Sequence, residues 1–263
     1  MAAPDTDDLQ AELDLALELA DRADRLTLPR FDSRAFSVDW KANRTEVTEV
    51  DRETETMISA VLHDRRPGHR LYGEEHGESG AAGSSWRWII DPIDGTSNYV
   101  RGVPVWATLI ALTHTEQGPV VGVVSAPSLG RRWWAARGHG AWLGERRLRV
   151  SDVAELADAS VAVTFSEGWD QLGLTANLVA LQQRAARARG YGDFWQHMLV
   201  AEGAVDIAID AIGVAPYDLA ALEVIVEEAG GRFTDRHGEV TFAHDSAVSS
   251  NGRLHDEVIA ALH

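Results

Sequence analysis

The amino-acid sequence predicts a layered α+β fold in which helices pack against a mixed β-sheet. Three observations lead to this prediction. Leucines recur at helical spacing near the N-terminus, short strands follow one another between residues 105 and 150, and helices alternate with strands from residue 151 onward. The chain has 263 residues, so we expect one domain built from two closely packed halves, about 1–150 and 151–263.

The first predicted elements are two amphipathic helices. Leucines recur every four residues within 7–27, and a second amphipathic pattern covers 51–62 before a Pro-Gly pair. A loop rich in Gly, Ser and Ala at 73–85 then leads to a short apolar strand at 88–90. This strand is expected to stop at an Asp-Pro pair, because proline cannot donate to the hydrogen bonds of a sheet.

A meander of strands is predicted for the middle of the chain. Segments 106–113 and 119–126 are rich in apolar residues and flank a Glu-Gln-Gly sequence at 116–118. A short connection that contains glycine between two such segments is typical of a β-hairpin. Further strands at 132–137 and 141–150 continue the meander.

Helices and strands alternate again in the second half. The predicted elements are a strand at 161–165, helices at 172–188 and 194–204, and a short strand at 207–209. A last helix is predicted over 219–229. Asp218 is placed at its N-cap, and Gly230-Gly231 is expected to end it.

The composition excludes several classes of protein. The formal net charge of −17 repels phosphate backbones, so nucleic acid is not an expected partner. The chain has no cysteine, which excludes disulfides, thiolate–metal sites and cysteine nucleophiles. No apolar run approaches the ~20 residues of a membrane span, and the acidic N-terminus lacks the features of a signal peptide. We therefore expect a cytoplasmic protein that contacts no membrane.

The most informative segment is Trp88–Thr96, in which an apolar strand delivers Asp91 and Asp94 to one point. The chain turns at Pro92, and Gly95 allows a close approach of the backbone. Two carboxylates around such a turn can converge on a hard cation such as Mg²⁺, which prefers oxygen ligands. The alternative is a capped turn in which Asp94 binds nearby amides. The position at the end of a strand, with more carboxylates upstream, favours the metal.

Other acidic residues are candidates to join this pair. Glu74 lies in the glycine-flanked loop Gly73–Gly77, whose alternative interpretation is a solvated turn. Asp218 and Asp51 each open a predicted helix, where capping is the commonest role of aspartate. A helix N-terminus also favours a bound phosphate, so the two roles are compatible. Lys41 is predicted to be a surface lysine unless the fold bends it inward.

Paired metal ions would indicate chemistry at phosphorus. Two ions about 3.5–4 Å apart can activate a water and stabilise the leaving alkoxide. The amides of Gly95 and Thr96, at the start of a possible short helix at 96–100, are candidate donors to phosphate. The Asp-x-x-Asp spacing differs from the Asp-x-Asp of aspartyl-phosphate phosphatases of the haloacid dehalogenase type. The histidines lack zinc-site spacing, and no P-loop is present.

These motifs together resemble the inositol monophosphatase family of magnesium-dependent, lithium-sensitive phosphatases. The matching segments follow the family order and are Val47–Asp51, Gly73–Gly77, Trp88–Tyr99 and Asp218–Gly231. The resemblance covers nearly the whole chain. It implies a layered αβαβα sandwich, a phosphomonoesterase activity without a covalent intermediate, and a homodimer.

The resemblance also implies a role for each matching residue. Two or three Mg²⁺ ions would be held by Glu74, Asp91, the Ile93 carbonyl, Asp94 and Asp218. Thr96 and Asp51 would orient the attacking water, and Glu74 would hold the same ion as that water. Gly95 and Thr96 would hold phosphate, and Ser97 is close enough to influence specificity.

Within the family, the chain is most similar to the actinobacterial-type histidinol-phosphatases. This similarity is carried by Val100–Leu112, Gly122–Gly138, Tyr191–Phe194 and Leu199–Ala208. It implies hydrolysis of L-histidinol phosphate, a late step in histidine biosynthesis. That substrate carries an amine and an imidazole, so its pocket should offer carboxylates. Asp193 and Asp210 are the candidates, with a helix cap as the alternative for Asp193.

Two other functions stay open. Within the same class, the protein could be an inositol-1-phosphatase or a broad sugar phosphatase. In a different class, it could be a catalytically silent metal-binding regulator, against which the complete set of acidic residues speaks. Two departures from the family bear on specificity. Tyr217 stands where the family usually has tryptophan, and segment 211–216 is one residue longer than its counterpart.

Overall fold

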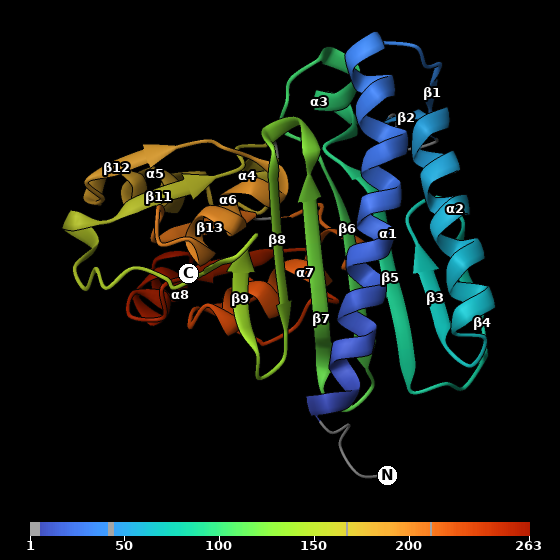
Figure 1. Cartoon of the computed structure of the whole chain (residues 1–263). Helices are drawn as coiled ribbons and strands as arrows, with labels where there is room; N and C mark the ends of the chain where they lie inside the picture. The colour runs from blue at the N-terminus through green and yellow to red at the C-terminus, as the bar shows by residue number, and fades with distance from the viewer. Residues whose placement is uncertain (1–5, 42–44, 167, 211) are drawn as a thin grey trace.

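The computed structural model of the chain describes residues 6–41, 45–166, 168–210 and 212–263. Within these ranges, helices and sheets alternate in five layers, which confirms the expected αβαβα sandwich (Figure 1). None of the described helices combines the length and the apolar composition that crossing a bilayer requires.

The first two layers are a helix pair and a large sheet. Helices α1 (Thr6–Ser33) and α2 (Glu49–Arg65) cover one face of eight strands ordered β10-β9-β8-β7-β6-β5-β3-β4. The strands are β3 (Arg70–Gly73), β4 (Gly77–Gly80), β5 (Trp86–Asp94), β6 (Ala107–His114), β7 (Gly118–Ala126), β8 (Arg131–Ala136), β9 (Gly140–Leu143) and β10 (Arg146–Arg147). Only the β3–β5 pair is parallel among these neighbouring strands, so the sheet is mixed, as predicted.

The remaining layers come from the second half of the chain. Helices α6 (Asp193–Ala201) and α7 (Pro216–Glu228) pack on the other face of the large sheet. Beyond them lies a five-stranded sheet ordered β12 (Arg187–Arg189), β11 (Ser160–Val163), β13 (Ile207–Asp210), β15 (Ala247–Ser250) and β14 (Arg232–Thr234). The outer layer contains α4 (Gly168–Gln171), α5 (Thr175–Arg184) and α8 (His255–Ala261).

Strand β5 shows how the sequence produces this sandwich. Successive side chains of a strand point to opposite faces of its sheet. Trp88 and Ile90 accordingly pack in the core beneath α1 and α2, whereas Ile89 packs in the core beneath α7. All three are at most 1% exposed. A strand that is buried on both faces consists of consecutive apolar residues, and this pattern makes β5 recognisable in the sequence.

Several predicted elements are wrong in extent. Strand β5 does not stop at Asp91-Pro92 but continues through this pair to Asp94. The helix expected over 172–188 is replaced by α5, which ends at Arg184, and by the edge strand β12. Alanine and arginine favour helices, but here their backbone pairs in parallel with β11. The strand expected over 141–150 breaks at Gly144, whose φ of +56° makes a turn between β9 and β10.

Helix α7 carries a buried acidic residue, one oxygen of which has no hydrogen-bond partner among the described residues. The residue is Glu223, which is 4% exposed, and the oxygen is its Oε2. Burial, followed by the charge of Glu227, raises the pKa of Glu223 to about 8. A folded pKa above the unfolded value means that stability is complete at low pH and declines as the pH rises toward 8.

Replacing Glu223 by glutamine is therefore expected to stabilise the protein at pH 9 by about 1–3 kcal/mol, the usual cost of an unsatisfied buried group. At pH 5 the variant and the parent should be nearly equal, since Glu223 is then protonated. Thermal denaturation at both pH values measures the difference. Glu53→Gln, whose exposed side chain pairs with Arg30, is the control and should not stabilise. A gain that is the same at both pH values would contradict this account.

Candidate active site and metal centre

Three carboxylates meet where β5 ends. Asp91 and Asp94 close this strand, and its pairing register with β6 shifts between them. Asp218 approaches from the first turn of α7. One oxygen from each of the three residues lies within 4.8 Å of the others. The fold thus brings together residues that the sequence separates by more than a hundred positions.

The first turn of α7 differs from the prediction. The helix begins at Pro216 with Ala215 as N-cap, so Asp218 is its third residue and not its N-cap. Proline suits the first helical position because its missing N–H would have no partner there. The Asp218 Oδ2 accepts a hydrogen bond of 2.6 Å from the Ala215 amide, and the side chain also bonds to Asp91. These contacts fix the carboxylate toward β5.

Glu74 supplies a fourth carboxylate. It follows β3, and its amide donates to the Ile90 carbonyl of the parallel neighbour β5 at 3.2 Å. Its side chain hydrogen-bonds to Asp91. The preceding Gly73 is required, because a Cβ there would lie 2.0 Å from Glu55 Oε1. The glycine-flanked loop is therefore a positioned segment and not a solvated turn.

Burial and mutual repulsion dominate the electrostatics of this cluster. Burial, reinforced by the neighbouring carboxylates, raises the pKa of Asp91 and of Asp94 well above the usual range. Burial also raises the pKa of Asp218 to about 7 and raises that of Glu74. Such groups cannot all ionise together unless a cation compensates them. A set of oxygen donors with excess negative charge fits Mg²⁺.

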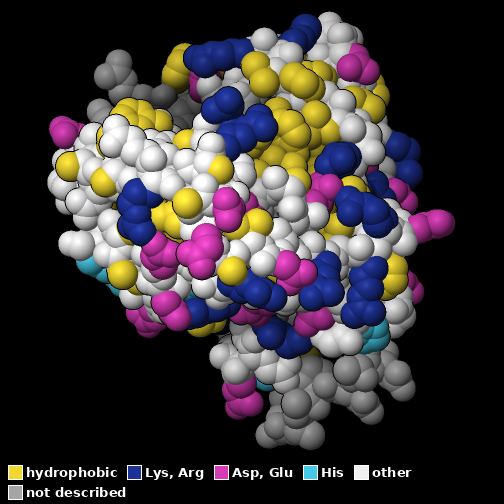
Figure 2. Space-filling model, turned by 90° about the vertical axis from the view of Figure 1, so that its left-hand side faces the viewer, with side chains coloured by type: hydrophobic (Ala, Val, Ile, Leu, Met, Phe, Trp, Pro, Cys, Tyr) yellow, Lys and Arg dark blue, Asp and Glu magenta, His cyan; other side chains and the backbone are white. Residues whose placement is uncertain are grey.

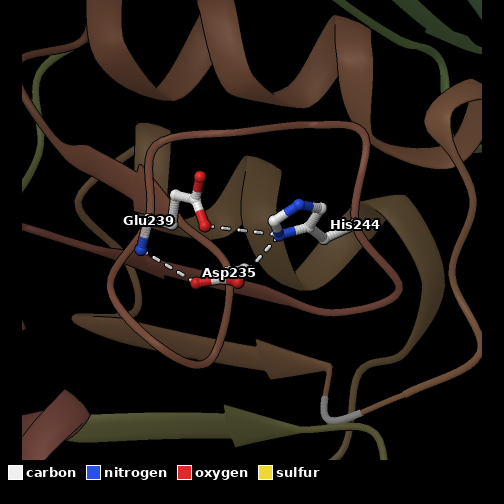
Figure 3. Close-up of side chains that lie close together, drawn as sticks. All are labelled: Asp235, Glu239 and His244. Atoms are coloured by element: carbon white, nitrogen blue, oxygen red, sulfur yellow. Dashed lines mark hydrogen bonds and ion pairs between the residues drawn. The ribbon is translucent and has the colours of Figure 1, made fainter.

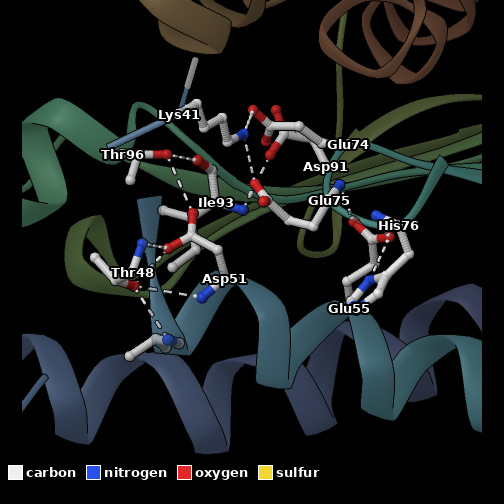
Figure 4. A network of polar contacts seen from close by, with 11 residues as sticks. Lys41, Thr48, Asp51, Glu55, Glu74, Glu75, His76, Asp91, Ile93 and Thr96 are labelled. Carbon is white, nitrogen blue, oxygen red and sulfur yellow. Dashed lines mark hydrogen bonds and ion pairs between the residues drawn. The ribbon is translucent and has the colours of Figure 1, made fainter. Parts of the chain in front are cut away.

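Lys41 lies at this cluster, and the prediction of a surface lysine is wrong. A small hairpin of β1 (Val38–Trp40) and β2 (Glu46–Thr48) carries it there. Its Nζ donates to Glu74 Oε1 at 2.7 Å and to Glu75 Oε1 at 2.6 Å (Figure 4). The side chain is 24% exposed. The hairpin turns it inward, which a local reading of the sequence could not reveal.

Asp51 and Thr96 form a polar pair beside the carboxylates. Thr48 caps α2 in a reciprocal capping box with Asp51, whose Oδ2 accepts from the Thr48 amide at 2.9 Å. Asp51 Oδ1 lies 3.1 Å from Thr96 Oγ, which also lies 3.0 Å from the Ile93 carbonyl oxygen (Figure 4). Burial raises the pKa of Asp51 to about 6. Asp51 therefore caps its helix with one oxygen and reaches the site with the other.

The residues expected to hold phosphate start the short helix α3 (Thr96–Arg101). Gly95 precedes it with a φ of +82°, and a Cβ there would lie 3.0 Å from the Val105 carbonyl oxygen and 3.3 Å from Asp193 Oδ2. A glycine is therefore needed to bring this backbone so close to the site. Ser97 is placed differently: its Oγ accepts from Arg101 at 3.2 Å, and no described contact joins it to the carboxylates.

A cavity of about 250 Å³ adjoins the cluster. Its walls combine residues of β5, α6, α7 and the ends of β11 and β13, among them Asp94, Thr164, Asp193, His197, Asp210 and Asp218. Asp210 is 7% exposed. Gln196 donates to its Oδ2 at 2.8 Å, and His197 Nε2 lies 2.8 Å from the same oxygen. Oδ1 is then the oxygen that remains for a ligand.

Asp193 faces the same cavity, and the alternative of a helix cap is wrong for it. Gly192 is the N-cap of α6, and Asp193 is the first helical residue, with a φ of +48°. Its Oδ2 accepts from Asn98 Nδ2 at 2.7 Å. Burial, and then the charge of Asp210, raises the pKa of Asp193 to about 6. The next amide, that of Phe194, donates to Asp94 Oδ2 at 2.7 Å.

Sequence reasoning missed several residues that position the site. Glu55 accepts from the amides of Glu75 and His76 at 2.8 and 2.9 Å and so holds the acidic loop. His197 sits between Asp210 and Ser249, whose Oγ lies 2.5 Å from its Nδ1. Both side chains lie in helices and are fully buried. A charged or polar residue on the buried face of an amphipathic helix was the available signal.

A second group of possible ligands lies in the loop after β14. Asp235 accepts from the Glu239 amide at 2.8 Å and from His244 Nδ1 at 2.9 Å (Figure 3). It also accepts from the His237 amide at 2.8 Å. Glu239 Oε2 is 3.9 Å from the same His244 nitrogen. All these contacts lie within the loop, so they explain the group as a closure of the loop.

The site described above has the features of an enzyme for phosphate esters. A buried oxygen cluster that fits Mg²⁺ lies next to backbone amides and to a polar cavity. The Inositol monophosphatase family matches residues 8–263, and the chain belongs to this family. It is thereby a phosphomonoesterase of a magnesium-dependent family.

Two curated relatives are similar to this chain over nearly its whole length. The chain is 51% identical over 257 residues to a histidinol-phosphatase of Mycobacterium tuberculosis, covering 95% of this chain and 97% of the relative. It is 47% identical over 259 residues to a histidinol-phosphatase of Streptomyces coelicolor, covering 95% and 96%. Among solved structures, an IMPase of Thermotoga maritima superposes with a TM-score of 0.85 at 30% identity over 96% of each chain. The resemblance read from the motifs is thus confirmed.

Proposed function

We propose that this protein hydrolyses L-histidinol phosphate to L-histidinol and phosphate. The observation that carries the proposal is the cavity that joins the carboxylate cluster to a second acidic pair, Asp193 and Asp210. A phosphate ester with a cationic end would place its phosphate at the cluster and its amine or imidazole at this pair. The relatives named histidinol-phosphatase, at 47% and 51% identity, support the same substrate.

The proposed metal ligands are the residues that the resemblance assigned, around two or three Mg²⁺ ions: Glu74, Asp91, the Ile93 carbonyl, Asp94 and Asp218. Bound ions would supply Lewis acidity and a water of lowered pKa. The Thr96 hydroxyl can donate to Asp51 Oδ1, and its lone pair can then accept from the attacking water. Thr96 orients this water, whose oxygen bonds to phosphorus while the P–O bond to the alcohol breaks. The proton of the water passes through the Thr96 hydroxyl to Asp51 Oδ1, and the departing alkoxide takes up a proton from solvent. No protein atom becomes covalently bonded to phosphorus.

Gly95 and Thr96 are proposed to donate their amides to the phosphate. Gly95 directly follows Asp94 and precedes α3 with a left-handed backbone, which supports this proposal. Ser97 is the weakest of the proposed substrate contacts, because its hydroxyl faces Arg101. Asp193 and Asp210 are proposed to bind the cationic end of the substrate.

Asp210→Asn is expected to lower kcat/KM for L-histidinol phosphate about 10- to 100-fold, mainly through KM, because a charge-assisted hydrogen bond contributes about 1.5–3 kcal/mol. The isosteric amide can keep its contacts with Gln196 and His197 through its oxygen. Asp193→Asn should also lower kcat/KM for L-histidinol phosphate. Steady-state kinetics with inositol-1-phosphate, which has no cationic end, is the control and should change little. Equal losses on both esters would argue against cation recognition.

A phosphate-release panel with Mg²⁺ tests the proposed function. L-histidinol phosphate should be the best substrate by kcat/KM. Comparable rates on inositol-1-phosphate or sugar phosphates would favour the alternative of a broad phosphatase, which the similarity to an IMPase of Thermotoga maritima supports. Release from none of these esters would favour the metal-binding regulator.

We also propose that the protein forms a homodimer. Figure 2 views the side of Figure 1 on which β11, β12 and α5 lie, and hydrophobic side chains gather in its upper part beside basic ones. The C-terminal half of the chain contains large hydrophobic residues with exposed side chains, for example Phe165, which is 70% exposed, and Val179, which is 41% exposed. The mass of the particle in analytical ultracentrifugation tests this proposal.

A further inference from the structure

Lysine is used at one position only in this chain. Of the 24 basic residues, Lys41 is the sole lysine, and all the others are arginine. The single lysine is also the basic side chain whose Nζ contacts the carboxylate cluster. A chain that otherwise uses arginine for its surface and its ion pairs has thus kept an ammonium group at the proposed metal centre.

The contacts of Lys41 divide between two kinds of carboxylate. Glu74, at 2.7 Å from the Nζ, is a proposed metal ligand and bonds to Asp91. Glu75, at 2.6 Å, points from the same loop, and its amide is held by Glu55 at 2.8 Å. Among the described contacts of Asp91, a side-chain hydrogen bond joins it to Glu74 and none joins it to Glu75. One partner of Lys41 therefore belongs to the metal centre, and the other does not.

The chemistry of the two basic side chains explains why arginine would be less suitable here. A guanidinium is a planar fork that grips a carboxylate with two parallel hydrogen bonds. An ammonium is a compact point charge on a flexible stem, and its donors rotate freely. It resembles a small cation and can leave one oxygen while it keeps another.

We propose that Lys41 is an exchangeable internal cation of the metal centre. It neutralises Glu74 when no divalent ion is bound there, and it moves its ion pair to Glu75 alone when Mg²⁺ binds. The competition for Glu74, together with the repulsion between Lys41 and the metal, lowers the affinity of the centre for Mg²⁺. This inference rests on the proposed role of Glu74 as a metal ligand.

A sole lysine makes the direct test simple. Protein labelled with ¹³Cε-lysine gives one side-chain resonance, that of Lys41, without any assignment step. Titration of the metal-free protein with MgCl₂ is expected to shift this resonance with the same midpoint as the binding isotherm from calorimetry. A resonance that stays unchanged while calorimetry reports saturation would overturn the proposal and leave the proposed function intact. If calorimetry itself detects no Mg²⁺ binding, the proposed metal centre fails, and this inference fails with it.

Three variants separate exchange from simple electrostatics. Lys41→Met should bind Mg²⁺ roughly tenfold more tightly, the effect of one unit charge on a divalent ion about 6 Å away in water. Glu75→Gln should bind it more weakly, because Lys41 then has Glu74 as its only partner. The double variant, Lys41→Met with Glu75→Gln, should bind Mg²⁺ about as tightly as Lys41→Met alone, because the Glu75→Gln substitution weakens binding only through Lys41.

An effect of Glu75→Gln that persists without Lys41 would assign it to the loss of one negative charge and would refute the exchange. Arg66→Met, which removes an ion pair with Glu12 far from the cluster, is the matched control for the loss of a positive charge. It should leave the Mg²⁺ affinity unchanged. Lys41→Arg should bind Mg²⁺ more weakly than Lys41→Met does, since arginine keeps the competing positive charge.

Discussion

Asp94→Asn is expected to lower phosphate release by at least a hundredfold while the protein remains folded. Exchange of residues that merely support metal ligands costs about 10–100-fold in metal affinity or activity, and loss of a ligand should exceed this. The asparagine oxygen can keep the hydrogen bond from the Phe194 amide, now 2.7 Å from Asp94 Oδ2. Its NH₂ group would then face the other carboxylates, and a donor repels the cation that those oxygens bind.

The experiment needs two readouts, initial rates of phosphate release at saturating Mg²⁺ and the thermal midpoint without added metal. The midpoint should stay equal or rise, because one of several repelling carboxylates has been neutralised. Asp152→Asn is a suitable control, since this aspartate has a 67% exposed side chain and pairs with arginines at the surface. Full turnover in Asp94→Asn would remove Asp94 from the mechanism.

Removal of divalent ions is the second change with a large expected effect. Dialysis against EDTA should abolish activity, and MgCl₂ should restore it. It should also expose a pH-dependent weakness of the fold, because burial raises the pKa of Asp91, Asp94 and Asp218, the last to about 7. For carboxyls whose folded pKa exceeds the unfolded value, stability is complete below about pH 4 and declines as the pH rises toward 7.

Thermal denaturation at pH 5 and pH 8, with EDTA and with MgCl₂, measures this effect. The difference between the two conditions should be larger at pH 8, because more of the carboxylates are then charged, and binding stabilises the folded state by mass action. The same comparison on Asp94→Asn should give a smaller difference. Equal midpoints with EDTA and MgCl₂ at pH 8 would mean that the buried carboxylates do not form a metal centre.

The elements that sequence analysis placed well are those whose signal is local. The burial of strand β5 follows from its continuous apolar run, but the strand does not stop at Asp91-Pro92 as predicted and ends at Asp94. The leucine pattern of α1 also predicted its face, although the helix extends six residues further than expected, to Ser33. The pairing of Asp91 with Asp94 followed from one short segment, whereas the likeness to a family needed four segments in order, from Val47 to Gly231.

The features that were misjudged depend on contacts between distant segments. Lys41 reaches Glu74 only because a hairpin folds over the end of the large sheet. β12 exists because β11 offers it an edge, although its residues favour a helix. The alternative of a helix cap stayed open for Asp193, because its partner Asn98 lies in helix α3, 95 positions away in the chain. The pattern of residues within one segment does not reveal which distant segment it will contact.

The link between α6 and the proposed metal centre has a consequence for the evolution of substrate choice. The donor to Asp94 is the main-chain amide of Phe194, which every amino acid except proline can supply. Mutations along the first turn of α6 can therefore exchange one recognised alcohol for another while the carboxylate stays anchored. Specificity can drift in such an enzyme without passing through an inactive ancestor.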